Sequence, residues 1–161
     1  MTELSRLLAP DRVGAGGLEQ VVEAGPEELL ALARRLMIPA VLRLRCTFHL
    51  RRAAGAVIAA EGDLEAEVVQ VCVATLDEFE QPVSERFAVT FVPAGSETDD
   101  DEPDSPDQLP FEGVIDLGEA AAEQLALALD PYPRRPDAPE LDNGESATGA
   151  FAALAALRIK P

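Results

Sequence analysis

The sequence has no tryptophan, only seven aromatic residues, two cysteines and one histidine in 161 residues. With so few aromatic side chains and 27 alanines, we expect a thin hydrophobic core built from Leu, Val and a few Phe. Two cysteines are too few for a disulfide framework, which favours a reduced, cytoplasmic protein. The single histidine leaves only one imidazole that could serve as a catalytic base.

Long apolar runs are also missing. No window reaches 18 apolar residues, so no segment is expected to span a membrane. Residues 1–17 lack a basic region followed by a long apolar run, so we expect no signal peptide there. Glycines at 14, 16 and 17 predict a loosely structured start. The length fits one domain, which we take as residues 1–161.

Positive charge is scarce in the C-terminal half. The net charge is −17, and between Arg86 and Arg134 there are 12 acidic and no basic residues. A chain this acidic should on average be repelled by nucleic acid. Any contact with RNA must therefore be local and must use the first third of the chain, where residues 34–52 hold six Arg and no acid.

What the sequence does contain is a clear β-strand pattern. Side chains alternate over residues 41–50 with a period of two, which is typical of a half-buried strand. The apolar face of this strand is expected to carry Leu42, Leu44, Cys46, Phe48 and Leu50. A three-residue loop at 54–56 would place Arg45 opposite Glu65 and Cys46 opposite Leu64 on the returning strand.

The remaining elements complete an α+β expectation. A helix is predicted over 25–37, a third strand over 83–92, and a helix from Asp116 to about residue 129 with Asp116 and Glu119 in a capping box. A second C-terminal helix is predicted over the Ala-rich run at 149–158. The predicted fold class is therefore α+β, with an antiparallel meander of three to four strands, in which residues 18–24 would supply the fourth strand. One helix precedes the meander and two helices follow it. A flexible acidic loop is expected at 94–110 and a Pro-rich linker at 131–147.

No metal or catalytic site is indicated, and no cofactor is expected. Zinc needs about four ligands, usually in close pairs. Cys72 has no second cysteine within the next three residues, and Cys46 and His49 should point to opposite faces of one strand. Each cysteine occupies one of the alternate strand positions that otherwise hold apolar residues, so we interpret both as small buried hydrophobic residues.

Two charged surfaces remain as candidate binding sites. The basic candidate lies on one strand face and could contact phosphates: Arg43, Arg45, His49 and Arg51. The alternative is that acidic residues of the neighbouring strand, from Glu61 to Glu67, neutralise it. The acidic candidate lies in the run from Ser96 to Gln108, where seven of 13 residues are acidic. This acidic surface could recruit a basic protein, or it could only keep the chain in solution. The candidate binding residues in it are Asp99, Asp100, Asp101, Glu102 and Asp104.

Three segments together resemble a known family. They are CVATLDEFEQPVSERFAVTFVP at 72–93, EGVIDLGEAAAEQLALALDPYP at 112–133 and GAFAALAAL at 149–157. Their order and spacing are similar to those of the YceD-like family, the large ribosomal RNA subunit accumulation proteins. Many members carry C-x-x-C where this chain has Cys72 to Thr75. If metal binding matters in those members, it cannot be carried over to this chain.

The resemblance implies a non-enzymatic bacterial or organellar factor in large-subunit ribosome biogenesis. Such a factor would support the synthesis, processing or stability of large-subunit ribosomal RNA. The implied partners are ribosomal RNA or a pre-ribosomal particle, and a basic large-subunit ribosomal protein. The alternative hypothesis is an acidic protein-binding module or chaperone for that basic protein, without direct contact to RNA.

Overall fold

The computed structural model describes residues 2–99 and 103–140 of the chain. The expected second C-terminal helix at 149–158 lies outside these residues. The described elements follow each other along the chain as β1 (Leu7–Leu8), a 3-10 turn (Pro10–Arg12), β2 (Leu18–Glu23), α1 (Pro26–Leu36), β3 (Ala40–Arg52), β4 (Ile58–Val71), β5 (Glu78–Pro93), β6 (Asp107–Phe111), β7 (Ile115–Asp116) and α2 (Leu117–Ala128).

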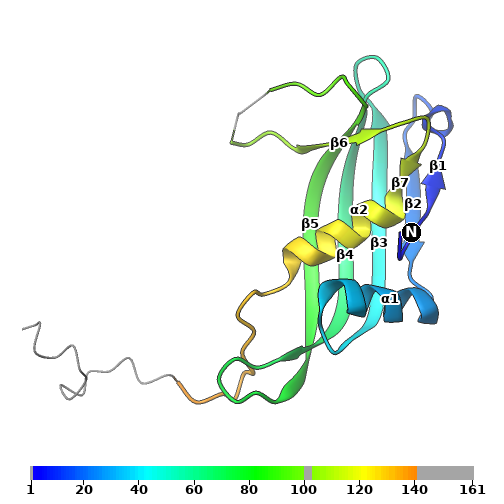
Figure 1. Cartoon of the computed structure of the whole chain (residues 1–161). Coiled ribbons are helices and arrows are strands. Elements are labelled where there is room, and N and C mark those ends of the chain that lie inside the picture. The colour runs from blue at the N-terminus through cyan, green and yellow to red at the C-terminus, as the bar shows by residue number, and fades with distance from the viewer. Residues whose placement is uncertain (1, 100–102, 141–161) are drawn as a thin grey trace, which may run out of the picture.

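The fold is an α+β fold with a five-stranded sheet in the order β2-β3-β4-β5-β6 (Figure 1). The meander of β3, β4 and β5 and the fourth strand β2 confirm the expectation, and their neighbouring strands are antiparallel. The fifth strand was not predicted. β6 pairs with the end of β5 in parallel, and β1 and β7 form a separate two-stranded sheet. Because β6 occupies residues 107–111, the acidic loop extends only from residue 94 to residue 106.

The register of the central hairpin is the one that the charge pattern predicts. Arg45 faces Glu65 and Cys46 faces Leu64 across β3 and β4. The start of β3 differs, because the register shifts between Val41 and Arg43. This bulge reverses the side-chain parity at that point, so Val41 is buried and Leu42 is 44% exposed. The expected place of Leu42 on the apolar face is therefore wrong.

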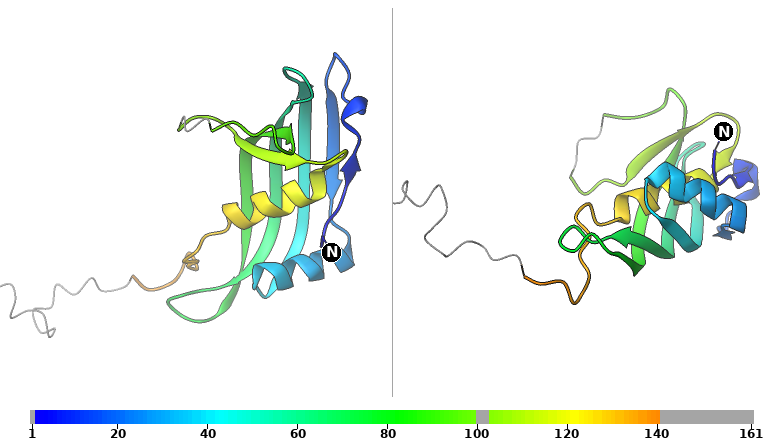
Figure 2. Two further views of the ribbon diagram at one scale, coloured as in Figure 1. Left: turned by 45° about the horizontal axis from the view of Figure 1, so that its top comes forward. Right: turned by 60° about the horizontal axis from the view of Figure 1, so that its bottom comes forward.

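Both helices lie on the same face of the sheet, α1 across its foot and α2 obliquely over its middle (Figures 1 and 2). Pro26 begins α1, and the Glu28 carboxylate accepts a hydrogen bond from the Gly25 N–H at 2.7 Å. Between helices and sheet lies the core, with Phe48, Leu64 and Leu125 among its most deeply buried side chains. No helix within residues 2–99 or 103–140 is long and apolar enough to cross a membrane.

The N-terminal segment is not loosely structured, contrary to the expectation from its glycines. Leu4 and Val13 are completely buried, and Leu8 is 5% exposed. The Arg6 guanidinium binds both Glu28 carboxylate oxygens, at 2.7 and 2.9 Å, and therefore fastens the segment to α1. The segment thus connects the two helices and forms part of the core.

The opposite face of the sheet is open, and its side chains are mostly polar. One long edge of the sheet is open as well. Over residues 78–88, β5 pairs with β4 on one side and has no strand on the other side within the described part of the chain. Pro82 and several charged side chains lie on this edge, which is a usual protection against unwanted strand pairing.

Candidate functional site

The four basic candidates on β3 lie together on the open face of the sheet, as predicted. Each has a carboxylate of β2 or β4 within 4 Å. Arg45 lies 2.7 Å from Glu23. The other pairs are longer: Arg51–Glu61 at 3.4 Å, His49–Glu19 at 3.4 Å, His49–Asp63 at 3.8 Å and Arg43–Glu65 at 3.8 Å.

The open face is therefore acidic in sum and not basic. Three Arg of β3 and Arg86 of β5 share this face with six carboxylates of β2 and β4: Glu19, Glu23, Glu61, Asp63, Glu65 and Glu67. Cross-strand pairs of this kind stabilise the strand register by a few tenths of a kcal/mol each, up to about 1 kcal/mol. A phosphate approaching β3 would have to displace these carboxylates, which weakens the basic strand as an RNA contact.

The acidic candidates are only partly within the described residues. Asp99 and Asp104 are exposed, whereas Asp100, Asp101 and Glu102 lie outside the described part. Hydrogen bonds hold the ends of this loop together. The Gln108 amide donates to the Thr98 carbonyl at 3.0 Å and accepts from the Thr98 N–H at 3.0 Å. The loop therefore starts and ends at a defined place beside β6.

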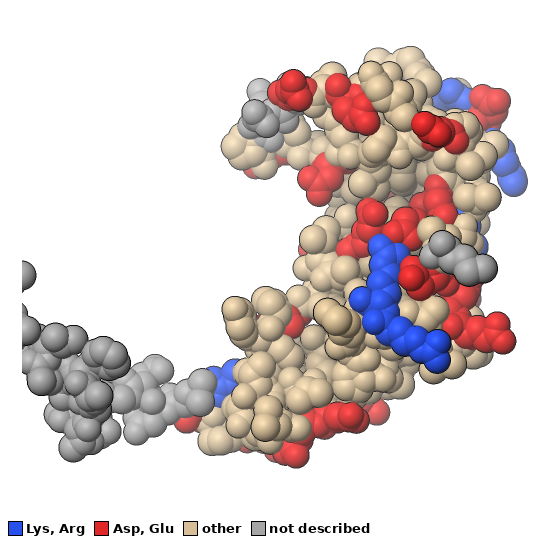
Figure 3. Space-filling model, viewed as in Figure 1, with Lys and Arg blue, Asp and Glu red and all other residues tan. Residues whose placement is uncertain are grey.

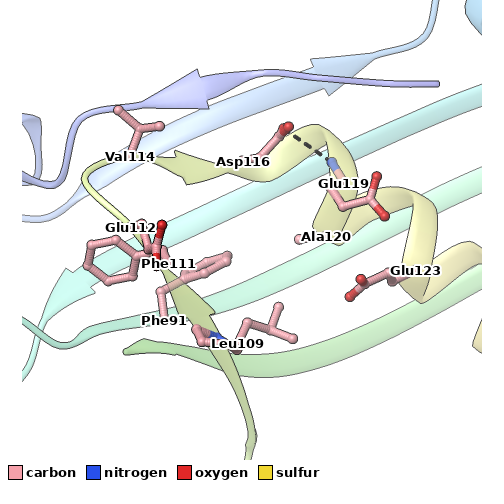
Figure 4. Close-up of a pocket in the computed structure, with 10 residues that line it drawn as sticks. Phe91, Leu109, Phe111, Glu112, Val114, Asp116, Glu119, Ala120 and Glu123 are labelled. Carbon is pink, nitrogen blue, oxygen red and sulfur yellow. Dashed lines mark hydrogen bonds between the residues drawn. The ribbon is translucent and has the colours of Figure 1, made fainter. Parts of the chain in front are cut away.

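A cleft of about 370 Å³ lies between β6 and α2, and sequence reasoning did not predict it. Figure 3 shows the helix-bearing face hollowed between the part that contains β6 and the part that contains α2. Its floor and walls are largely apolar: Phe91, Leu109, Pro110, Phe111, Val114 and Ala120. Four carboxylates also line the cleft, and Figure 4 shows them around the apolar floor: Glu112, Asp116, Glu119 and Glu123.

Two of these carboxylates have structural partners. Asp116 caps α2 by accepting hydrogen bonds from the N–H groups of Gly118 at 3.0 Å and Glu119 at 3.2 Å. Glu119 does not complete the predicted capping box, because its carboxylate binds the Arg35 guanidinium at 2.6 and 3.0 Å. These two acids therefore hold the helix in place and are not free to bind a ligand.

The other two carboxylates, Glu112 and Glu123, have no ion-pair partner among residues 2–99 and 103–140. Glu112 is exposed, and Glu123 is partly buried. Burial raises the pKa of Glu123, and the nearby charge of Glu119 raises it further, against a smaller lowering by Arg35. Ionisation of Glu123 is therefore less favourable in the folded protein than in the unfolded chain.

We expect Glu123→Gln to stabilise the protein at neutral pH. A raised pKa in the folded state means that ionised Glu123 costs stability above that pKa, and that the cost disappears once both states are protonated. The melting temperature at pH 7 should therefore rise by roughly 1–2 °C, and the difference from wild type should vanish below about pH 4. Thermal unfolding between about pH 3 and pH 8 measures this difference. Glu112→Gln, a change at an exposed carboxylate of the same cleft, is the control. A loss of stability on Glu123→Gln at pH 7 would contradict the argument.

The two cysteines are free and buried, but they differ in environment. Burial raises the pKa of Cys46 to about 12, with a smaller contribution from the charge of Asp63. Cys72 follows the end of β4 in a tight turn. A hydrogen bond from the Thr75 side chain, with backbone donors that include the Arg135 N–H, lowers its pKa to about 7. Cys72 therefore accepts hydrogen bonds that close the turn between β4 and β5.

The described part of this acidic chain is an α+β structure with one long sheet, two helices on a single face of that sheet and a carboxylate-lined cleft beside α2. A family model, that of the large ribosomal RNA subunit accumulation protein YceD, matches residues 60–157 of the chain. The chain therefore belongs to the YceD family, as the resemblance of its segments predicts. The match begins in β4, so β1 to β3 and α1 precede it. No significant match was found among the curated proteins or among the solved structures.

Proposed function

We propose that this protein is a non-enzymatic cytoplasmic factor in large-subunit ribosome biogenesis that acts by binding a cationic protein. Through that partner it supports the synthesis, processing or stability of large-subunit ribosomal RNA. The family supports the process, since its members are named for the accumulation of this RNA. The basic large-subunit ribosomal proteins are the class of partner that best fits the charge of the chain.

The observation that carries this proposal is the pairing of the basic strand. All four residues that could contact phosphate on β3 already face carboxylates within 4 Å. The chain has a net charge of −17, so its long-range field attracts cations and repels nucleic acid. A cationic protein gains from this field, whereas RNA has to overcome it.

The residues with reactive groups support a binding role rather than catalysis. His49 lies on the open face of β3, while Cys46, three residues earlier on the same strand, is buried in the core. They cannot form a nucleophile–base pair, because the strand separates them. Cys72 is completely buried in a turn, so a substrate does not reach its sulfur.

A second candidate function is direct contact with RNA through β3. It is favoured by the common orientation of Arg43, Arg45 and Arg51 on one exposed face. Contacts made through so few cations would be weak, non-specific and steeply dependent on salt. Such binding would disappear between 50 and about 200 mM salt.

One experiment separates the two candidates. The tagged protein and its triple variant Arg43→Ser, Arg45→Ser, Arg51→Ser are purified from cells with and without nuclease, and bound RNA and proteins are identified. We expect ribosomal proteins to remain bound after nuclease treatment, and to remain bound to the variant. Partners that vanish with nuclease, together with loss of RNA from the variant, would show that β3 contacts RNA directly and would refute the proposed function.

A further inference from the structure

The cleft between β6 and α2 combines an apolar floor with carboxylates that have no ion-pair partner in the described residues. Its floor is apolar, with Phe91 and Ala120 only 3% and 2% exposed, and Val114 at its edge is 44% exposed. Glu112 and Glu123 stand beside this floor with no ion-pair partner in the described residues. Figure 4 shows the Glu123 carboxylate directed from α2 toward the side of Leu109.

Glu112 and Glu123 contribute little to the stability of the folded protein. Burial raises the pKa of Glu123, and the negative charge of Glu119 adds to the effect. All lining residues fall between Phe91 and Glu123, within the stretch that contains no Lys or Arg. The Arg35 guanidinium is already bound to Glu119 and to Glu3. Within residues 2–99 and 103–140, the charges of Glu112 and Glu123 are therefore uncompensated, which leaves them available to a cation from a partner.

The shape and chemistry of the cleft identify the kind of ligand. A volume of about 370 Å³ lies at the lower end of ligand pockets, which span roughly 300–1,000 Å³. It fits one or two long side chains rather than a large cofactor. Lys and Arg side chains combine an apolar stem with a charged head, so the stem can cover an apolar floor while the head binds a carboxylate. Phosphate groups are excluded by the four acids.

We propose that this cleft is the docking site for a Lys- or Arg-bearing segment of a protein partner. The stems of its basic side chains lie on Phe91, Leu109 and Ala120, and their charged heads bind Glu112 and Glu123. The inference rests on the proposed function, because it names the site at which the cationic partner binds. It places that site in the cleft rather than in the acidic loop that begins at residue 94.

A peptide probe tests this directly. The probe is the acetylated, amidated pentapeptide Arg-Leu-Lys-Leu-Arg, added to the ¹⁵N-labelled full chain at about 50 mM salt, where charge attraction is weakly screened. We expect the largest amide shifts at Leu109, Phe111, Ala120 and Glu123. The same peptide with Gly in place of Leu should bind more weakly, because it lacks the apolar part. Spermidine, a small free cation, should not reproduce the pattern of shifts.

Two double variants with the same change in charge supply the controls. Glu112→Gln with Glu123→Gln should weaken binding of the probe by roughly fivefold or more, since each partly exposed ion pair contributes a modest share. Glu78→Gln with Glu80→Gln removes two exposed carboxylates from β5, outside the lining of the cleft, and should leave the affinity within about twofold. Val114→Ser removes part of the apolar wall and should weaken the probe without changing the net charge.

The outcomes distinguish the inference from the proposed function. Equal losses in both double variants, or shifts centred on residues 96–99 and 103–104, would overturn the cleft as the docking site. Spermidine shifts identical to those of the peptide would overturn the requirement for a protein segment. Neither result affects nuclease-resistant binding of ribosomal proteins in cells, which tests the proposed function separately. Loss of that binding in the cleft double variant alone would support both.

Discussion

Replacing Asp116 by Ala is expected to lower the free energy of unfolding by about 3 kcal/mol. The Asp116 carboxylate caps α2 through the N–H groups of Gly118 and Glu119. It also accepts hydrogen bonds from the Arg6 N–H at 2.8 Å and the Ser5 hydroxyl at 2.7 Å. One side chain thus starts the helix and fastens the N-terminal segment to it. Both contributions are lost together in the Ala variant.

Urea and thermal unfolding measure this loss, which should appear as a fall in melting temperature of about 10 °C. Asp116→Asn keeps an acceptor for the backbone N–H groups, so it should stay within about 1 kcal/mol of wild type. Asp130→Ala removes a carboxylate that accepts one exposed hydrogen bond, from the Tyr132 N–H, and should cost no more than about 0.5 kcal/mol. Similar small losses for Asp116→Ala and Asp130→Ala would show that the N-terminal segment is not held by Asp116.

The second large effect is expected for Gly118→Ala. Whether this substitution raises or lowers the stability of the protein distinguishes helix propensity from tertiary packing. Helix propensity alone predicts a gain of up to about 1 kcal/mol, since Gly118 is the second residue of α2. The structure predicts the opposite. A Cβ at this position would lie 2.8 Å from the Leu4 carbonyl and 2.8 Å from the Arg6 nitrogen. Because both are backbone atoms of the packed N-terminal segment, the segment has to move, and we expect a loss of roughly 2 kcal/mol.

Trypsin adds a local readout to the unfolding measurement. Displacement of the segment should loosen the backbone around Arg6 and Arg12, so cleavage after these residues should be faster in Gly118→Ala than in wild type. Gly14→Ala is the control, because a Cβ at residue 14 would meet no atom within 4 Å. It should leave both stability and cleavage unchanged. A more stable Gly118→Ala variant with unchanged cleavage would mean that helix propensity outweighs the backbone contact.

These predictions concern the part of the molecule that supports the cleft. Asp116 is itself a lining residue, and α2 carries Glu119 and Glu123 into the cleft. The N-terminal segment reaches the same helix from the other side, where Leu117 donates its N–H to the Arg6 carbonyl at 3.0 Å. The position of the candidate docking site therefore depends on residues at both ends of the described chain.

Local patterns were enough to predict the central hairpin and both described helices. The register of β3 and β4 follows from a short loop and from opposite charges, so the sequence alone predicts that Arg45 lies opposite Glu65 and Cys46 opposite Leu64. The start of α1 at Pro26 and the cap of α2 at Asp116 depend on residues within one helical turn. The same period of two correctly placed the four basic candidates on one face.

Charge pairing on that face could be foreseen only in part. The sequence indicates that β4 can neutralise β3, but it does not show that β2 also brings Glu19 and Glu23 against His49 and Arg45. Two acidic strands therefore flank the basic one. The candidate RNA contact is weaker than the run of Arg in the sequence indicates, because electrostatic surfaces depend on neighbours in space.

The sequence by itself determined the α+β class, the antiparallel hairpin register, the helix boundaries and the acidic character of the chain, because each depends on neighbouring residues or on composition. Only the tertiary structure decided the features that join distant segments. β6 pairs with β5 although the strand Asp107–Phe111 has no alternating pattern and contains Pro110. The N-terminal segment is buried although its glycines indicate a loop, because α2 and α1 supply its partners. The cleft exists because β6, β5 and α2 bring Leu109, Phe91 and Glu123 together, and no periodicity in a single segment encodes a contact of that kind.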